Sequence, residues 1–357
     1  MINLFTSLVE IDSPSYAERE MCDRLTCELK ALGFDVFEDD AGAAIGGNAG
    51  NLYAYLCGDE SLEPLLFCAH MDTVEPSRGK AAVVDGDVIT SRGDTVLGAD
   101  DLAGIVSILT AVRRVRDGRH RPIEVLFTVA EEVYGRGAKI FDYSKIKSKM
   151  AIVPDLSGVV GGAASRAPTI IQFSATVRGK AAHAGFAFGE GIHAIAAAAQ
   201  AVTKMPMGQV DADTTCNLGV INGGLAGNIV PDLCRVSGEI RSYDHGKALA
   251  QLREVERIFM QSAERYSAAL EFESEVMIEA YECDKDVADL FEKVCVNLKI
   301  PVKLHPTFGG SDNNHIVKHG IKGLVIASAM NNCHSTKEYT EVREMERLTD
   351  ILTELML

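Results

Sequence analysis

An apolar segment near residue 70 ends in two side chains that could bind a metal or move a proton. The stretch "LLFCAHMDTV", residues 65–74, begins with side chains suited to burial and continues into His70-x-Asp72. Residues i and i+2 of an extended chain project from the same face, so this imidazole and carboxylate can lie side by side. A single pair of this kind is equally consistent with a loop and a turn, so the rest of the chain has to decide.

Four further segments carry the same residue types where an apolar run ends or a helix begins. They are Asp100 and Asp101 in "LGADD", Glu131 and Glu132 after "VLFTVA", Asp155 after "AIVP", and His334 after "LVIASAMNNC". Taken alone, Asp100 or Asp101 could simply cap the helix that follows, and paired glutamates are common on surfaces. Open α/β sheets bind ligands beyond the carboxyl ends of their strands, so the recurrence across five elements favours one shared site.

The residue types predict a site for divalent metal ions. Two histidines and at least three carboxylates would converge there, and mixed nitrogen and oxygen ligands suit zinc, with cobalt or manganese as alternatives. Buried unpaired charges are costly, so this number of carboxylates favours two ions. In two-metal hydrolases the ions lie about 3.5–4 Å apart and share a water or hydroxide. The sequence has no G-x-S-x-G motif and no cysteine with a persuasive histidine partner, which disfavours a serine or cysteine nucleophile.

The segments that must position these residues read as a largely parallel α/β sheet. "NLYAYLCG", "PLLFCAHMD", "IEVLFTVAEE" and "AIVPDLSG" are short apolar runs typical of buried strands, and a segment of helical period lies between the second and the third. Strand, helix and strand at these lengths indicate a parallel sheet. Near the N-terminus, Ser15 and Glu18 have the spacing of a capping box and predict a helix over 16–32 that Gly33 ends.

The pattern changes near residue 165. "APTIIQFSATVRG" alternates like a half-exposed strand, and further strands and two helical segments follow up to about residue 277. We therefore expect an inserted α+β domain, 165–277, between the two parts of a first domain, 1–164 and 278–357. "KGLVIASAM" returns to the buried-strand type, and "MERLTDILTELML" predicts a closing helix.

Composition excludes several classes of partner. The 357 residues are 47% hydrophobic, and the formal net charge of −16 argues against nucleic acid and anionic membranes. The nine cysteines show no framework spacing, so we expect reduced thiols and a cytoplasmic protein. "MINLFTSLVEIDSPS" lacks the features of a signal peptide, and no apolar stretch approaches the roughly 20 residues of a membrane span. His315 and His319 have the spacing of a helical metal pair, but we expect them at a solvated helix end because Gly320 follows.

A set of motifs in this order resembles one family, the M20 metallopeptidases, and especially their peptidase T (tripeptidase) branch. The motifs are "AHMDTV", "LGADDLAG", "AEEVYGRGA", "PDLSG", "GKAAHAG", "GNIVPD", "EIRS", "GGSDNN" and "CHSTKE". They extend from Ser13 to the last helix. The resemblance implies a di-zinc exopeptidase fold, in which a mostly parallel sheet carries the catalytic site and an inserted α+β domain serves as a lid or dimerisation domain.

The resemblance also implies which residues hold the metals. His70, Asp100 and Asp155 would bind one zinc ion or lie on the side that it shares with the second ion, with Asp100 as the bridge between the two. Glu132 and His334 would complete the second site together with Asp100.

Two further carboxylates gain roles from the resemblance. Asp72 would orient His70 through the far ring nitrogen, and Glu131 would act as the general base toward a metal-bridging water. Family members commonly have a cis peptide bond after the bridging aspartate, so we predict a cis bond between Asp100 and Asp101.

The inserted domain would contribute to substrate binding. The resemblance implies that His183 stabilises the oxyanion, often from a neighbouring subunit, and that Asn228 and Arg241 hold the substrate. Arg241 could bind a peptide carboxylate, although a surface ion pair explains it equally well. The loop with Gly309 and Gly310 would line the substrate pocket.

Asp155 bears on the reaction. In this family an aspartate at this position is usual in aminopeptidases and dipeptidases, whereas deacylases and carboxypeptidases usually carry glutamate. We therefore expect an aminopeptidase that acts on short peptides and that can form a homodimer through the lid. The alternatives are an amidohydrolase for N-acyl amino acids and a non-catalytic protein on the same fold. Leu102 stands where peptidase T-like sequences commonly have lysine, which concerns substrate preference and not the metals.

Overall fold

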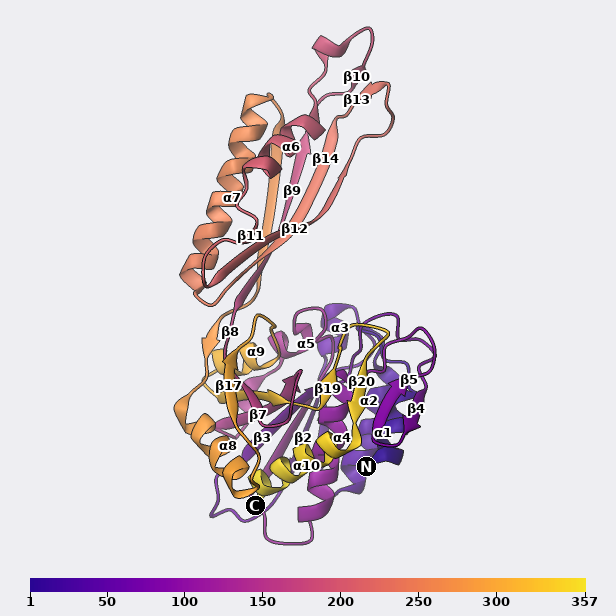
Figure 1. Ribbon diagram of the computed structural model, residues 1–357, viewed down its shortest axis with the longest axis vertical. Coiled ribbons are helices and arrows are strands. Elements are labelled where there is room, and N and C mark those ends of the chain that lie inside the picture. Colours follow the sequence, from indigo (N-terminus) through magenta and orange to yellow (C-terminus); the bar gives the residue numbers. More distant parts are fainter. The chain divides into compact units, whose positions relative to one another are not determined.

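Two hydrophobic cores divide the chain. The computed structural model describes residues 1–357, and the two cores define two units (Figure 1). Unit 1 comprises Met1–Arg166, Glu282–Thr307 and Ser311–Leu357, and unit 2 comprises Ala167–Tyr281 and Phe308–Gly310. The continuous part of unit 2 corresponds to the insertion expected over 165–277. Residues 308–310, which we expected in the first domain, belong to unit 2 by their contacts.

The apolar runs of the sequence form the centre of a nine-stranded sheet in unit 1. In spatial order its strands are β1 (Asp35–Glu38), β2 (Leu52–Leu56), β6 (Ile123–Thr128), β3 (Leu65–His70), β7 (Met150–Leu156), β18 (Lys322–Ala327), β8 (Gly162–Ala167) and β16 (Tyr281–Glu282), with β17 (Lys303–Pro306) paired to β8. The four central strands, β6, β3, β7 and β18, pair in parallel. Their carboxyl ends therefore lie along one edge, and the predicted α/β class with a mostly parallel sheet is confirmed.

Burial on both faces explains why these runs form central strands. Every residue of β3 and β6 is buried, because helices cover both sides of a sheet of this kind. The helices of unit 1 are α1 (Ile2–Val9), α2 (Arg19–Ala31), α3 (Ala41–Ile45), α4 (Ala99–Val115), α5 (Arg136–Ile140), α8 (Lys285–Asn297), α9 (Asn313–Lys318) and α10 (Val342–Met356), with a 3-10 turn at Tyr143–Lys145. The closing helix was predicted correctly as α10. Its residues Leu348, Ile351, Leu352 and Leu355 form a fully buried stripe at helical spacing.

The capping box predicted for the first long helix is wrong. Helix α2 begins at Arg19, and its N-cap residue, Glu18, makes no capping hydrogen bond; the N–H of Arg19 donates to Asn48 Oδ1 at 3.0 Å instead. The Ser15 hydroxyl instead donates to Asp72 Oδ2 at 2.7 Å, and Glu18 Oε1 accepts from the backbone N–H of Ala130 at 3.0 Å. The helix ends as predicted, with Gly33 in the left-handed region at φ +94°.

A smaller sheet in unit 1 supports the loops beyond the central strands. It contains, in order, β19 (Met330–Asn331), β20 (Tyr339–Glu341), β5 (Val88–Ser91) and β4 (Ala82–Asp85), all antiparallel. The connection between β19 and β20, residues 332–338, carries His334. The loop after β5 leads to α4, and Asp100 lies at the start of that helix.

Unit 2 is an antiparallel sheet covered on one face by two helices. The sheet order is β11 (Gly208–Gln209), β12 (Thr214–Gly223), β14 (Leu233–Ser242), β9 (Thr169–Arg178) and β15 (Ala269–Ile278), the helices are α6 (Ala194–Lys204) and α7 (His245–Arg265), a 3-10 turn spans Phe188–Glu190, and β10 (Ala182–His183) pairs with β13 (Ile229–Val230). Alternate residues of β9, including Ile171, Phe173 and Ala175, are buried in the core of unit 2, as the alternating pattern predicted.

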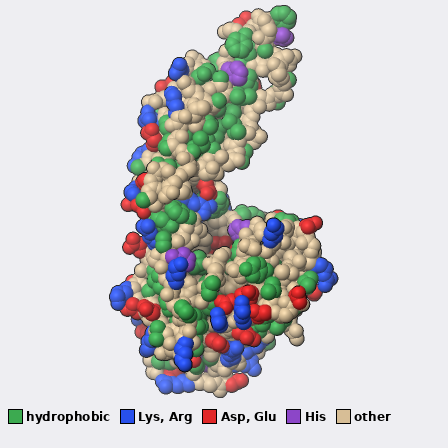
Figure 2. All heavy atoms as spheres, viewed as in Figure 1, with side chains coloured by type: hydrophobic (Ala, Val, Ile, Leu, Met, Phe, Trp, Pro, Cys, Tyr) green, Lys and Arg blue, Asp and Glu red, His purple; other side chains and the backbone are tan.

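No helix of the protein is both long enough and apolar enough to cross a lipid bilayer. On the face of unit 1 that Figure 2 shows, acidic and basic side chains are interspersed, with no extended basic patch. Hydrophobic side chains are more prominent on the visible face of unit 2.

Candidate metal centre

His70 stands at the carboxyl end of β3 with its ring held in one orientation. The side chain is 1% exposed, and Nδ1 lies 2.9 Å from the backbone oxygen of Asp72 and 3.5 Å from its Oδ1. A carbonyl oxygen can only accept, so Nδ1 carries the proton and Nε2 is directed elsewhere. The orienting group is therefore the Asp72 carbonyl in the first place and its carboxylate in the second. Such a contact fixes the tautomer of a ligating histidine.

The Asp72 carboxylate organises the neighbouring loop after β6. It is fully buried and accepts hydrogen bonds from the backbone N–H of Glu131 at 2.9 Å and of Glu132 at 3.1 Å. Burial would raise the pKa of Asp72, but the contact with His70 keeps that pKa below its usual value. One ionised side chain thus aligns the ends of β3 and β6.

Asp100 contacts both histidines of the predicted site. Its Oδ1 lies 3.0 Å from His70 Nε2, and its Oδ2 lies 3.3 Å from His334 Nε2. Burial acts to raise the pKa of Asp100, but the two histidines hold it well below the usual value. Asp101, in contrast, caps the helix, because its Oδ1 accepts from the N–H of Gly104 at 3.2 Å. The predicted cis peptide bond between Asp100 and Asp101 is confirmed.

The remaining predicted ligands surround Asp100. His334 Nε2 lies 2.9 Å from Glu132 Oε2, and Asp155 Oδ1 lies 3.9 Å from His70 Nε2. His334 has a left-handed backbone, at φ +60°, within the loop between β19 and β20. Glu132 Oε1 is buried and has no hydrogen-bond partner. The structure thus brings all five predicted ligands to one edge of the sheet.

Two overlapping sets of donor atoms could each hold a metal ion. One set is His70, Asp100 and Glu132, and the other is His70, Glu131 and Asp155; within each set the ligand atoms lie within 4.8 Å of one another. Glu131, predicted as the base, therefore faces the same centre as the ligands. Nitrogen and carboxylate donors at this density fit divalent ions such as zinc.

The raised pKa values of the carboxylates in the centre also indicate a site for cations. Burial, together with the charge of Asp155, raises the pKa of Glu131 well above its usual value, and burial and Asp100 do the same for Asp155. Burial and the charge of Asp100 raise the pKa of Glu132 to about 7. So many carboxylates in one buried place are stable as anions only when cations compensate them.

Two residues that support the centre were not predicted. Glu18 holds the loop after β6 through Ala130, whose φ is +54°. Glu338 accepts three backbone hydrogen bonds from the loop that leads to Asp100. The motif "CHSTKE" contains Glu338, but the sequence gives no sign of its partners, which are more than 230 residues away.

The predicted residues His183 and Asn228 lie together at one end of unit 2. They meet through the pairing of β10 with β13, and the N–H of Ala184 donates to Asn228 O at 3.0 Å. His183 Nδ1 accepts from the N–H of Gly185 and of Phe186, at 3.1 and 3.2 Å. Since Nδ1 accepts, a neutral His183 carries its proton on Nε2 and presents a donor there.

Arg241 lies at the other end of the unit 2 sheet, beside residues 308–310. Its Nε and Nη2 donate to the Glu239 carboxylate at 2.8 and 3.1 Å, and its Nη1 donates to the backbone oxygen of Phe308 at 2.7 Å. The ion pair weighed for Arg241 is therefore present, with both partners partly exposed. A Cβ on Gly310 would lie 2.1 Å from Ile278 Cδ1, so a larger residue there would require the Ile278 side chain to move. Gly309 is adjacent, so the structure brings the predicted loop to Arg241.

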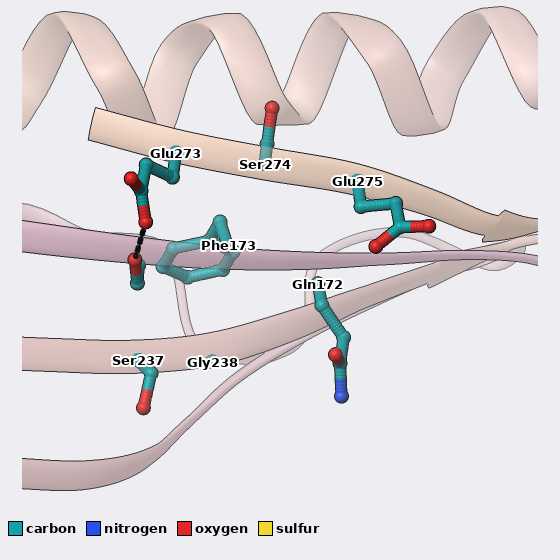
Figure 3. A pocket seen from close by; sticks show the side chains of 8 residues that line it. Gln172, Phe173, Ser237, Gly238, Glu273, Ser274 and Glu275 are labelled. Atoms are coloured by element: carbon teal, nitrogen blue, oxygen red, sulfur yellow. Dashed lines mark hydrogen bonds between the residues drawn. The ribbon is translucent and has the colours of Figure 1, made fainter. Parts of the chain in front are cut away.

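A cavity of ≈ 370 Å³ lies on the open face of the unit 2 sheet, between β9, β14 and β15 (Figure 3). The Ser174 hydroxyl donates to the Glu273 carboxylate at 3.5 Å, and the dashed line at Glu273 in Figure 3 marks this hydrogen bond. Glu275 and Gln172 line the same cavity. It contains no histidine or cysteine and none of the predicted site residues.

The expectation for His315 is wrong. It is 5% exposed, and its burial lowers its pKa to about 4. Helix α9 packs so closely against the start of α5 that a Cβ on Gly135 would lie 2.9 Å from the His315 ring. The helix stop at Gly320, with φ +82°, is confirmed.

Comparison with known proteins gives matches over the whole chain. Residues 168–267 match the peptidase dimerisation domain of the M20 group, and residues 51–211 match peptidase family M28. The Bacillus subtilis protein YqjE is 34% identical over 100% of this chain and 97% of its own. The crystal structure of aminopeptidase PepT from Bacillus cereus superposes with a TM-score of 0.91 at 36% identity, covering 99% of this chain and 96% of that chain. A tripeptidase structure from Staphylococcus aureus gives a TM-score of 0.95 at 30% identity, with the same coverage.

Proposed function

The chain belongs to the M20 peptidases, in the peptidase T-like branch, and from this premise we propose that it is a two-metal aminopeptidase that removes the N-terminal residue of short peptides. Membership of the family makes it a metallopeptidase; the direction of cleavage, the two zinc ions and the short substrate are the proposal. The observation that supports it most is the meeting of His70, Asp100 and Glu132 with Glu131 and Asp155 at one sheet edge.

Each residue of the centre has a proposed task. The five ligands, His70, Asp100, Glu132, Asp155 and His334, would hold two zinc ions, with cobalt or manganese as substitutes. Such ions, when bound, polarise a carbonyl and lower the pKa of water.

Glu131 would accept the proton of the attacking water and deliver it to the leaving amine. Asp72 keeps Glu131 in place, because its carboxylate accepts from the backbone N–H of Glu131. The backbone oxygen of Asp72 holds the ring of His70.

Two observations support the aminopeptidase reading, and a third concerns the compartment. Asp155 is the residue type usual in the aminopeptidases and dipeptidases of this family, and the matched structures are an aminopeptidase and a tripeptidase. None of the nine cysteines forms a disulfide, which suits the reducing cytoplasm that we propose as the compartment.

Free peptide termini should be required at both ends of the substrate. We expect N-acetylation or C-terminal amidation of a tripeptide to lower kcat/KM by about 10- to 150-fold, the worth of a charge-assisted contact in a closed site. The measurement compares kcat/KM for the free, N-acetylated and amidated tripeptide, with a dipeptide and a tetrapeptide alongside. Preference for the N-acetylated form would contradict the aminopeptidase and indicate the alternative deacylase.

The preference for a tripeptide with a free C-terminal carboxylate over its C-terminal amide should depend on Arg241. Three of the five guanidinium N–H donors are used by Glu239 and Phe308, which leaves two for a substrate carboxylate. We expect Arg241→Ala to cleave the acid and the amide at similar rates. Glu239→Gln is the matched control, because it removes the competing charge and keeps the guanidinium. Full discrimination in Arg241→Ala would show that another group binds the carboxylate.

One chain cannot offer both His183 and Arg241 to the same short peptide. His183 pairs with Ile229, before β14 begins, whereas Arg241 lies near the end of β14. From Leu233 to Arg241 the strand rises roughly 26 Å at about 3.3 Å per residue. An extended tripeptide spans only about 10 Å. If both residues bind substrate, one of them must come from a second copy of the chain.

We therefore place His183 of one copy at the metal centre of another, in a homodimer. Unit 2 exposes large apolar side chains that association could cover. Phe186 is 91% exposed, Leu225 is 89% exposed, and Val220 and Ile221 on β12 are about half exposed. The peptidase dimerisation domain that matches 168–267 supports the same role for unit 2.

Two inactive variants should complement each other in such a dimer. We expect His183→Ala and Asp100→Asn to be nearly inactive alone, and a mixture after subunit exchange to recover about a quarter of wild-type activity. Half of the dimers would then be mixed, each with one intact centre facing one intact His183. The measurement is peptidase activity of the mixture against the separate variants. No recovery in mixed dimers, or full activity of a monomer, would contradict the shared site.

A further inference from the structure

Glu338 is a buried carboxylate in unit 1 that contacts backbone groups only. It is 2% exposed. Oε2 accepts from the N–H of Leu97 and of Gly98, both at 2.7 Å, and Oε1 accepts from the N–H of Asp100 at 2.9 Å. Both oxygens therefore hold the segment that ends at Asp100, the residue between the two histidines of the metal centre.

The segment that carries Glu338 also carries His334. In the connection between β19 and β20, the N–H of Glu338 donates to Ser335 O at 3.1 Å, and the Ser335 hydroxyl donates to Asn332 O at 2.8 Å. The Asn332 amide closes the turn by donating to Lys337 O at 3.3 Å. His334 and Glu338 thus belong to one short closed loop.

This arrangement links two metal ligands that no strand pairing connects. Asp100 lies at the start of α4, and His334 lies between two strands of the smaller sheet. Their side chains must remain 3.3 Å apart, at the spacing of Oδ2 and Nε2. Glu338 joins the two segments through three hydrogen bonds to a charged acceptor, the strong class of hydrogen bond in a buried place.

We propose that Glu338 is a positioning residue for the metal centre, which fixes Asp100 relative to His334 and so maintains the affinity of the site formed by Asp100, Glu132 and His334. The inference rests on the proposed two-metal centre. According to the proposal, the affinity for the second ion depends on Glu338, a side chain that does not contact that ion. Partners of this kind typically change metal affinity 10- to 100-fold.

Glu338→Gln tests the proposal with little change in shape. An amide has one oxygen, so it can serve Leu97 and Gly98, while its NH₂ group faces the N–H of Asp100. Metal-free protein would be titrated with Co²⁺ and followed by its visible absorption, with the ion-to-protein ratio measured by mass spectrometry. We expect wild type to bind two ions and the variant to bind one of them about 10- to 100-fold more weakly. The kcat of the variant should fall and recover with excess metal, with KM unchanged.

Glu124→Gln is the matched control. Glu124 is also fully buried and also holds backbone N–H groups, those of Lys147 at 2.9 Å and Ser148 at 2.7 Å. It lies near the start of β6, at the opposite end of that strand from Glu131. We expect this variant to lose thermal stability, as Glu338→Gln does, but to bind both ions as wild type does.

Several results would overturn the proposal. Binding of both ions by Glu338→Gln with wild-type affinity would do so, and so would equal weakening in Glu124→Gln. If Glu338→Gln does not fold, Glu338→Asp is tested instead. Aspartate keeps the charge, but its side chain is one methylene shorter, which moves the carboxylate away from the three backbone N–H groups. Wild-type affinity in that variant would exclude the positioning role. A wild-type protein that binds fewer than two ions would refute the metal centre itself.

Discussion

Replacement of Glu131 by glutamine should lower kcat by about 10²–10⁴-fold while both metal ions remain bound. The amide keeps the size of the side chain and most of its hydrogen bonding but cannot accept a proton. The backbone of Glu131 should stay in place, because its N–H donates to the buried Asp72. The measurement is kcat on a free tripeptide, with metal content determined on the same sample.

Glu132→Gln is the control for this prediction. Glu132 is next in sequence, its N–H is held by the same Asp72, and its side chain contacts His334 at 2.9 Å. We expect this variant to lose metal, in contrast to Glu131→Gln. Both glutamates belong to ligand sets that include His70, so the geometry alone does not decide which of them is the ligand and which is the base. If Glu131→Gln lost the metal and Glu132→Gln kept it, the two roles would have to be exchanged.

Replacement of Asp100, the proposed bridging carboxylate, should have the largest effect of all. Asp100→Asn is expected to bind neither ion tightly and to lose more than about 10⁴-fold in kcat/KM, since metal ions supply several kcal/mol and each 1.36 kcal/mol is tenfold in rate. Asp100 is the one carboxylate in contact with both His70 and His334, so its replacement removes a partner from both histidines. Metal content and activity would be measured together.

The adjacent Asp101 provides the control. Asp101→Asn changes a buried aspartate whose Oδ1 caps helix α4 through Gly104 and which contacts neither histidine in the structure. We expect a lower melting temperature with both metals retained. If Asp101→Asn lost the metal and Asp100→Asn kept it, the bridging residue would be Asp101 and the assignment to Asp100 would be wrong.

The centre was predictable because its residues are tied to strand ends. His70 and Asp155 each follow or end a fully apolar run, and parallel pairing brings such ends to one edge without any detailed knowledge of packing. Residue type and spacing could not separate Asp100 from Asp101, since both fit a helix start, and the family resemblance alone assigned the bridge to Asp100. The geometry shows that Asp101 caps the helix while Asp100 faces the histidines.

The errors have a common physical origin. Ser15 and Glu18 have the spacing of a local motif, but their partners are Asp72 and Ala130, which are distant in sequence. Glu338 binds backbone N–H groups, and these carry no residue-type signal at all. Contacts of this kind leave no periodicity and no fixed spacing, so sequence patterns either misassign the side chain or pass over it.

The crowding of carboxylates around His70 has a consequence for how the enzyme acquires its metal. Burial and neighbouring charge raise the pKa of Glu131 and Asp155 well above the usual value and that of Glu132 to about 7. At neutral pH the metal-free centre therefore retains protons on part of its ligand set. Each incoming cation has to displace them, so loading is an exchange of protons for metal. Acidification returns the protons and opposes the exchange, which makes the metal occupancy of the enzyme a function of pH as well as of metal supply.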